Sequence, residues 1–321
     1  MKVIRWKNLL IVVATMFMVR YFLLASVAGG MEVMDVSGVM VPVTLKMPWY
    51  DFLLLVIASV CLTAGGYVIN DYFDIKTDII NRGNVIVGTV IPRRRALMFH
   101  NILNVIGVAA GFAVSARAGY FWLGTLFLII SGLLWFYSAS YKRQFLIGNL
   151  LVALLTALIP VAVMFYEFPF MFSYYESNSI GHPGYRVLFL WTGGFALFAF
   201  MTTLAREIIK DIEDYEGDME FGRNTLPVIL GIRSSRIVVA LLLASIIGSL
   251  YLAWVFILSD LLTLIYISVA LAVPLLVVLC MVVTGKCKRR FHDASSLMKY
   301  TMLAGLIYTA IVKIILSKGL F

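Results

Sequence analysis

Residues 50–78 read YDFLLLVIASVCLTAGGYVINDYFDIKTD, and this stretch decides the fold. A helix needs about 20 predominantly apolar residues to cross a bilayer, and residues 50–69 supply such a run. Directly after it, the polar segment 70–78 carries three aspartates at steps of three and four. Because such steps place side chains on one helical face, the stretch predicts a membrane-spanning helix that continues into a column of carboxylates.

The rest of the chain repeats the apolar pattern. Of its 321 residues, 62% are hydrophobic and 13% are charged, whereas a soluble domain is about a quarter charged and just under half apolar. The three cysteines form no metal or redox spacing. We therefore expect an all-α, polytopic membrane protein, with residues 1–321 forming a single transmembrane domain. Nine apolar runs can be placed, at 9–28, 50–69, 97–116, 119–138, 145–165, 187–205, 237–257, 261–283 and 298–316.

Three longer connections stand out between these runs. Residues 70–96 and 206–236 are polar, of the kind found in cytosolic loops. Residues 166–186 are rich in aromatic side chains, which settle at membrane–water interfaces. The sequence thus predicts two cytosolic loops and one interfacial aromatic belt.

The basic residues give the orientation. All but six of the 26 Lys and Arg residues fall on the side of the N-terminus. The six exceptions are Arg20, Lys46, Arg117, Arg186, Lys313 and Lys318. Because cytosolic loops are enriched in Lys and Arg, we expect a cell (inner) membrane protein with a cytoplasmic N-terminus. This distribution at the ends of apolar runs also argues against nucleic acid as a partner. A cleaved signal peptide is the alternative for the N-terminus, but Arg20 interrupts its apolar run.

A second acidic motif repeats the first. Ten of the 17 acidic residues lie in the two polar loops. The spacing of Asp71, Asp74 and Asp78 recurs 140 residues later in Asp211, Asp214 and Asp218. Both motifs follow apolar runs on the predicted cytoplasmic side. We expect them to face each other across one cavity.

The two columns of carboxylates predict a magnesium–diphosphate site. Like charges at helical steps repel, and Mg²⁺ binds a few carboxylates together with waters and substrate phosphates. A metal with Lys or Arg side chains stabilises a leaving diphosphate. The cations that accompany the acids are Arg82, Lys142, Arg206 and Lys210. A solvated charged loop is the alternative, but two copies of one spacing favour a site.

These motifs resemble those of the UbiA superfamily of intramembrane prenyltransferases. Residues 70–78 resemble the first aspartate-rich motif, NDxxDxxxD, and residues 211–218 resemble the second. Residues 222–227 (GRNTLP) are similar to the segment that follows the second motif. Smaller similarities are Arg5-x-x-Asn8, Tyr137-Ser138-x-x-Tyr141-Lys142 and Gly148-Asn149. The resemblance covers essentially the whole chain.

The resemblance implies a ring of nine transmembrane helices around a central cavity. It also implies Mg²⁺-dependent transfer of a polyprenyl group from an allylic prenyl diphosphate to a lipophilic acceptor, within membrane lipid and at the cytoplasmic face. The metal ligands would be Asn70, Asp71, Asp74, Asp78, Asp211, Asp214 and Asp218. Asp71, Asp74, Asp211 and Asp214 would be catalytic. The diphosphate would be bound by Arg82 and Lys142, with Arg206 and Lys210 binding it or neutralising the acids.

The sequence is compatible with several alternatives. Residues 206–214 resemble the branch that alkylates geranylgeranylglyceryl phosphate, whereas other branches use 4-hydroxybenzoate or dihydroxynaphthoate. After the first motif, many members read NRPxRPxxSG, but residues 81–88 contain no proline here. Two other functions are alternatives to an enzyme. One is an ion-coupled transporter, and the other is a subunit that binds a prenyl group without turnover. The basic run 286–290 (KCKRR) either anchors the topology or attracts an anionic lipid or acceptor.

Overall fold

The computed structural model describes residues 5–75, 79, 85–179 and 181–317. The predicted ligands Asp78 and Arg82 lie outside the described residues. The chain forms two compact units. Unit 1 comprises residues 1–141 and 159–192, and unit 2 comprises residues 142–158 and 193–321. The long helices α7 (Ile147–Asn178) and α8 (Tyr185–Glu213) each contribute residues to both units.

Nine helices among the described residues are long and apolar enough to cross a membrane, as the sequence predicts. The protein is therefore a multi-pass membrane protein. The helices extend over Trp6–Gly29, Trp49–Phe73, Arg93–Arg117, Phe121–Ala139, Ile147–Asn178, Tyr185–Glu213, Leu226–Leu258, Leu261–Thr284 and Lys288–Ser317. Most of them exceed the predicted apolar runs, because their polar ends continue the helix beyond the hydrophobic segment.

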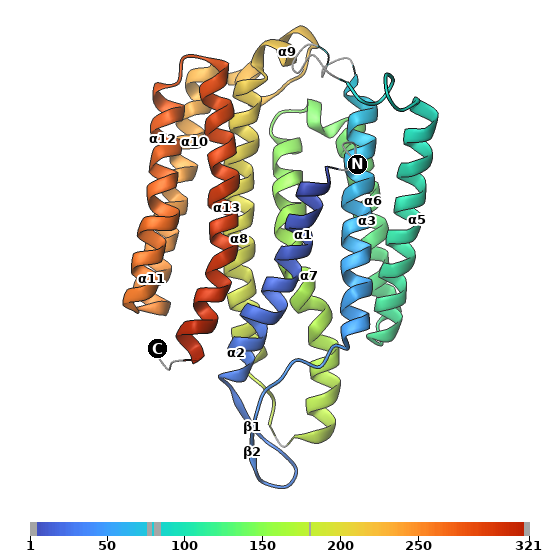
Figure 1. Ribbon diagram of the computed structural model, residues 1–321, viewed down its shortest axis with the longest axis vertical. Coiled ribbons are helices and arrows are strands. Elements are labelled where there is room, and N and C mark those ends of the chain that lie inside the picture. Colours follow the sequence, from blue (N-terminus) through green and yellow to red (C-terminus); the bar gives the residue numbers. More distant parts are fainter. Residues whose placement is uncertain (1–4, 76–78, 80–84, 180, 318–321) are drawn as a thin grey trace. The chain divides into compact units, whose positions relative to one another are not determined.

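Unit 1 begins with a helix in three parts, α1 (Trp6–Met18), the π-helical η1 (Val19–Leu24) and α2 (Ala25–Gly29). Helix α3 (Trp49–Phe73) packs against α5 (Arg93–Arg117) and against α6 (Thr125–Ala139), which follows the 3₁₀ turn η2 (Phe121–Gly124) (Figure 1). A glycine allows α5 to contact α6 as well: a Cβ atom on Gly111 of α5 would lie 2.3 Å from the ring of Phe127 of α6. Close approach of α5 and α6 thus requires glycine at this position.

One end of unit 1 is closed by a hairpin of β1 (Glu32–Met34) and β2 (Met40–Pro42). The chain after this hairpin is bound to Glu167 of α7, which is fully buried. Glu167 accepts hydrogen bonds from the backbone N–H groups of Lys46 (2.6 Å) and Met47 (2.7 Å) and from Nε of Arg20 (3.0 Å). Paired in this way, a charge can be buried in an apolar span.

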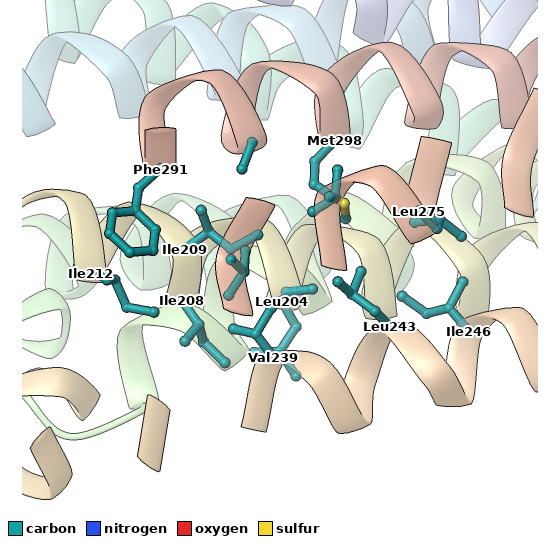
Figure 2. Close-up of a cluster of buried hydrophobic side chains, with 14 of the residues drawn as sticks. Leu204, Ile208, Ile209, Ile212, Val239, Leu243, Ile246, Leu275, Phe291 and Met298 are labelled. Atoms are coloured by element: carbon teal, nitrogen blue, oxygen red, sulfur yellow. The ribbon is translucent and has the colours of Figure 1, made fainter. Parts of the chain in front are cut away.

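Unit 2 contains the 3₁₀ turn η3 (Tyr141–Arg143) from Lys142 onward, the start of α7, most of α8 and all later elements. These later elements are α9 (Tyr215–Glu220), α10 (Leu226–Ala253), η4 (Trp254–Leu258), α11 (Leu261–Tyr266), η5 (Ile267–Ala272), α12 (Val273–Thr284) and α13 (Lys288–Ser317). Figure 2 shows the apolar core between them, to which Ile208 of α8, Leu243 of α10 and Met298 of α13 contribute. The core fixes α8, and with α8 the second acidic motif.

The prediction for the aromatic segment 166–186 is wrong in part. Helix α7 continues to Asn178, so most of this segment is helical. Tyr166 and Tyr175 are 2% exposed and lie inside unit 1. Their hydroxyls have hydrogen-bond partners: that of Tyr166 lies 2.8 Å from Ser115 Oγ, and that of Tyr175 accepts from the Thr44 N–H at 2.7 Å. A buried Tyr hydroxyl needs such a partner, so these two tyrosines belong to the interior of unit 1.

Candidate functional site

The first acidic motif continues the end of α3. Asp71 lies in the last turn of the helix, and Asp74 follows its final residue. The Asp74 N–H donates to the Asn70 carbonyl at 3.0 Å, so the helical hydrogen-bond pattern extends through Asp74. The Asp71 side chain is 14% exposed, and Asp74 is 8% exposed as a residue. The prediction that this motif extends a membrane-spanning helix is confirmed as far as Asp74.

Asp71 is paired with a cation from the first span. Nη2 of Arg5 donates to Oδ1 of Asp71 at 2.7 Å. The Arg5 guanidinium also lies over the Tyr67 ring, 5.1 Å from its centroid. This contact brings the start of the first span to the end of α3 at one end of unit 1.

The second motif follows a helix with a break. Helix α8 ends at Glu213, and α9 begins at Tyr215, with Asp214 between them at φ −93° and ψ 10°. The helical pattern of hydrogen bonds nevertheless continues, because the Asp214 N–H donates to Lys210 (2.8 Å) and the Asp218 N–H donates to Asp214 (3.0 Å). The second column therefore keeps the helical hydrogen bonds, but its backbone dihedral angles depart from those of an α-helix at Asp214.

Each carboxylate of the second motif has a different polar partner within unit 2. Asp211 Oδ2 accepts a hydrogen bond from Nδ2 of Asn149 at 2.7 Å. Lys288 Nζ lies 4.0 Å from Oδ1 of Asp214. The buried Asp218 pairs with Arg223 at 3.5 Å. Among these partners, Asn149 alone is neutral, so it orients its carboxylate without cancelling the charge.

Two of the predicted diphosphate-binding cations, Arg206 and Lys210, form ion pairs with Glu207. Arg206 Nη1 lies 2.6 Å from Oε1 of Glu207, and Lys210 Nζ lies 3.4 Å from Oε2 of the same residue. This pairing fits the expectation that they neutralise the acids. Lys142 lies half-buried in η3.

Sequence reasoning assigned no role to three polar partners of the second motif. These are Arg223, Lys288 and His292, whose Nδ1 lies 3.0 Å from Oε1 of Glu213. Arg223 follows Asp218 by five residues, which is a usable local signal. For Lys288 and His292 no spacing rule applies, because they lie more than 70 residues away on α13. Arg5 and Asn149 stood out only as parts of the resemblance.

The donor chemistry of both motifs fits a hard divalent cation. Asn70, Asp71 and Asp74 in unit 1, and the aspartates of the second motif in unit 2, offer only oxygen ligands. Within the described part of the chain, no three His, Cys, Asp or Glu side chains come together as a metal-binding group. Mg²⁺ does not require such a group, since it usually keeps waters and binds one or two carboxylates together with substrate phosphates. That both motifs face one cavity stays a prediction.

Comparison with known proteins gives consistent matches. The UbiA prenyltransferase family matches residues 36–303. Digeranylgeranylglyceryl phosphate synthases are similar at the level of sequence. The match to the Pyrococcus abyssi protein is 35% identical and covers 54% of this chain and 55% of that protein. For Thermococcus sibiricus the identity is 37%, with 58% of each chain covered. For Methanosphaera stadtmanae it is 30%, over 79% of this chain and 85% of that protein. The first two relatives are thus matched over less than two thirds of their length.

Solved structures share the fold. One, solved for insight into digeranylgeranylglyceryl phosphate synthase in membranes, is 20% identical with a TM-score of 0.64, and the match covers 97% of this chain and 96% of that chain. Another is a UbiA homologue from Archaeoglobus fulgidus bound to GPP and Mg²⁺, 15% identical with a TM-score of 0.51, over 94% of this chain and 98% of that chain. At these identities the likeness establishes the fold alone.

Proposed function

Because the chain belongs to the UbiA prenyltransferase family, we propose that it transfers a polyprenyl group from an allylic diphosphate to geranylgeranylglyceryl phosphate. The observation that carries this proposal is the match to digeranylgeranylglyceryl phosphate synthases at 30–37% identity, in one case over 79% of this chain. The acceptor hydroxyl would become the ether oxygen of the product. The proposed active site lies at the cytoplasmic face, with the N-terminus on the same side.

The donor site is assigned to the two acidic motifs, with the whole chain acting as one transmembrane domain. Asn70, Asp71 and Asp74 form one wall and the second motif forms the other, with Asp78 added from the sequence alone. When bound there, Mg²⁺ would neutralise charge on the diphosphate as it leaves. Lys142 and Arg82 bind remaining phosphate oxygens. Arg206 and Lys210 balance Glu207 and add positive potential beside the second motif.

The contacts within each unit support these roles. Asn149 holds the Asp211 carboxylate in one orientation and leaves its negative charge available for a cation. Arg5 holds Asp71 through an ion pair instead, and brings a guanidinium to the place where phosphate oxygens would arrive. Preorganised charges of this kind act on the leaving group without reorganising during the reaction.

The acids that lie within the spans of unit 1 do not support an ion pathway. Glu167 is fully buried and paired with Arg20. Asp51, also fully buried, is paired with Arg117 near the start of α3. Transport sites use ionisable groups near the bilayer midplane. The contacts of Asp51 and Glu167 instead indicate a structural role at the hairpin end of unit 1.

Product analysis tests the proposal. The purified protein in nanodiscs is supplied with Mg²⁺, labelled geranylgeranyl diphosphate and a mixture of geranylgeranylglyceryl phosphate, 4-hydroxybenzoate and dihydroxynaphthoate. Mass spectrometry should show one added geranylgeranyl group on the glyceryl phosphate. Transfer to an aromatic acid would reassign the acceptor. No transfer to any acceptor by a folded, metal-supplied protein would reject the proposed activity.

A further inference from the structure

The connection between α12 and α13 forms a short, strongly basic segment together with the first turn of α13. Helix α12 ends at Thr284 and α13 begins at Lys288. Residues 286–290 carry four cations among five residues, and all five side chains are exposed. We call residues 286–290 the basic connection. Four positive charges so close together must be stabilised either by solvent or by an anionic partner.

The basic connection is held in place by Arg236 of α10. Nη2 of Arg236 donates to the Gly285 carbonyl at 2.6 Å, and Nη1 donates to the Val283 carbonyl at 3.4 Å. These bonds satisfy carbonyl groups at the end of α12 that have no partner within the helix. The Arg236 guanidinium also lies over the ring of Phe291, which is buried in the core of unit 2 (Figure 2). The backbone on both sides of the cations is therefore anchored.

The basic connection lies beside the second acidic motif, within the same unit. Lys288 approaches Asp214 to 4.0 Å, and His292, one turn further along α13, lies 3.0 Å from Glu213. For Arg289 and Arg290, the described residues include no carboxylate within ion-pair distance. Two guanidinium groups, on the residues that directly follow Lys288, thus have no ion-pair partner among the described carboxylates.

The reaction proposed above, on which this inference rests, joins two anionic substrates. The donor carries a diphosphate and the acceptor carries a phosphomonoester. Like charges repel strongly near the low-dielectric membrane. A second set of cations is therefore needed, separate from the groups that hold the diphosphate. Arginine suits this task, because its planar guanidinium donates two parallel hydrogen bonds to a phosphate.

We propose that Arg289 and Arg290 of the basic connection bind the phosphomonoester of the acceptor lipid. Because they directly follow Lys288, which lies 4.0 Å from Asp214, they would bring the acceptor headgroup close to the donor site while keeping its charge paired. The two arginines are then specificity-determining residues for a phosphorylated acceptor. They take no part in ionising the donor.

Steady-state kinetics in nanodiscs of neutral lipid test this assignment. The double variant Arg289→Gln/Arg290→Gln should raise KM for geranylgeranylglyceryl phosphate about tenfold or more, since two charge-assisted interactions are lost. KM for geranylgeranyl diphosphate should stay unchanged. The matched control is Arg94→Gln/Arg95→Gln, which removes two exposed cations from the first turn of α5 and should change neither constant. An unchanged acceptor KM, or an equal rise in both constants, would overturn the proposal.

Two further measurements separate the possible outcomes. If the double variant loses activity only in nanodiscs that contain anionic lipid, the basic connection binds bulk headgroups and the assignment is wrong. Equilibrium binding of geranylgeranylglyceryl phosphate is compared with that of geranylgeranylglycerol, which lacks the phosphate. Wild-type protein should prefer the phosphorylated lipid, and the double variant should lose this preference. If the wild-type protein prefers the phosphorylated lipid but shows no prenyl transfer, the proposed function alone is rejected. If it transfers the prenyl group but shows no such preference, the role of the two arginines is rejected.

Discussion

Asn149 donates a hydrogen bond to Asp211 at 2.7 Å, joining the start of α7 to the last turn of α8 within unit 2. The donor is a neutral amide, so the carboxylate is oriented and keeps its charge. A metal-binding carboxylate benefits from both properties, because outer-shell hydrogen bonds fix the geometry of the ligand.

Replacement of Asn149 should therefore weaken metal-dependent transfer. Loss of an outer-shell partner costs roughly 10–100-fold in metal affinity or activity, so Asn149→Ala should show a loss in this range at limiting Mg²⁺. Asn149→Asp should be worse, because it places a like charge against Asp211. The Mg²⁺ dependence of turnover measures both. Asn101→Ala, at an exposed position on α5, is the control. Wild-type Mg²⁺ dependence in Asn149→Ala would contradict the assigned role.

The pair of Arg5 and Asp71 should matter for the donor substrate. Arg5→Met removes the hydrogen bond at 2.7 Å and a positive charge beside the first motif. We expect kcat/KM for the prenyl diphosphate to fall about tenfold or more, as for loss of a charge-assisted interaction. Arg5→Lys should be intermediate, since an ammonium group is a point charge without the guanidinium fork. The control Lys7→Met removes an exposed cation nearby on α1. Equal effects of Arg5→Met and Lys7→Met would show that the contact with Asp71 is not used.

Removal of a carboxylate from either acidic motif should impair metal-dependent transfer. Asp74→Asn and Asp214→Asn keep the shape of the side chain but remove the negative charge. Each should reduce transfer at least about 100-fold, because a metal that carries the charge of the leaving group supplies several kcal/mol. A chelator should abolish wild-type turnover, and added Mg²⁺ should restore it. Glu32→Gln, in the exposed hairpin, should behave as wild type. Retention of activity after complete removal of divalent metal would exclude the magnesium site.

The two motifs should meet around one substrate. In a background with Cys61, Cys280 and Cys287 replaced by Ser, the pair Asp74→Cys and Asp214→Cys should be linked by a short bifunctional thiol reagent. Carboxylates that share a cation with Mg–O distances of about 2.0–2.1 Å must lie close together. Mass spectrometry of the linked peptides measures the product. Glu32→Cys combined with Asp214→Cys should give no link. If thiols at 74 and 214 react singly but never become linked, the shared site is wrong.

The buried pair of Arg20 and Glu167 should control stability more than catalysis. The two side chains are 5% and 0% exposed, with their closest atoms 3.0 Å apart. Removal of one partner, as in Glu167→Ala, leaves an uncompensated buried charge and should cost about 3–5 kcal/mol. The double variant Arg20→Met/Glu167→Gln removes both charges and keeps an acceptor for the backbone N–H groups of the hairpin segment, so it should be more stable than Glu167→Ala. Reversible unfolding in mixed detergent micelles measures the difference. A double variant less stable than the single one would contradict a purely electrostatic cause.

The sequence by itself determined the features that depend on neighbouring residues. The length of each apolar run gives the nine spans, because a helix of fixed rise must cover the hydrocarbon thickness. The steps of three and four in the acidic motifs give their common face through the helical repeat. Family membership follows from the same local motifs. For Asp71 and Asp74, position at the end of a span is already visible in residues 50–78.

Only the tertiary structure decided which residues partner these acids. Asn149 and Asp211 are 62 residues apart, and Arg20 and Glu167 are 147 residues apart. No helical or strand period connects positions so distant, since such contacts depend on how separate helices pack. Glu167 shows the consequence: its aromatic neighbours suggest an interface, but Arg20 supplies the charge that allows it to be buried. In a membrane protein, a charged residue becomes structural or functional according to the partner that packing brings to it.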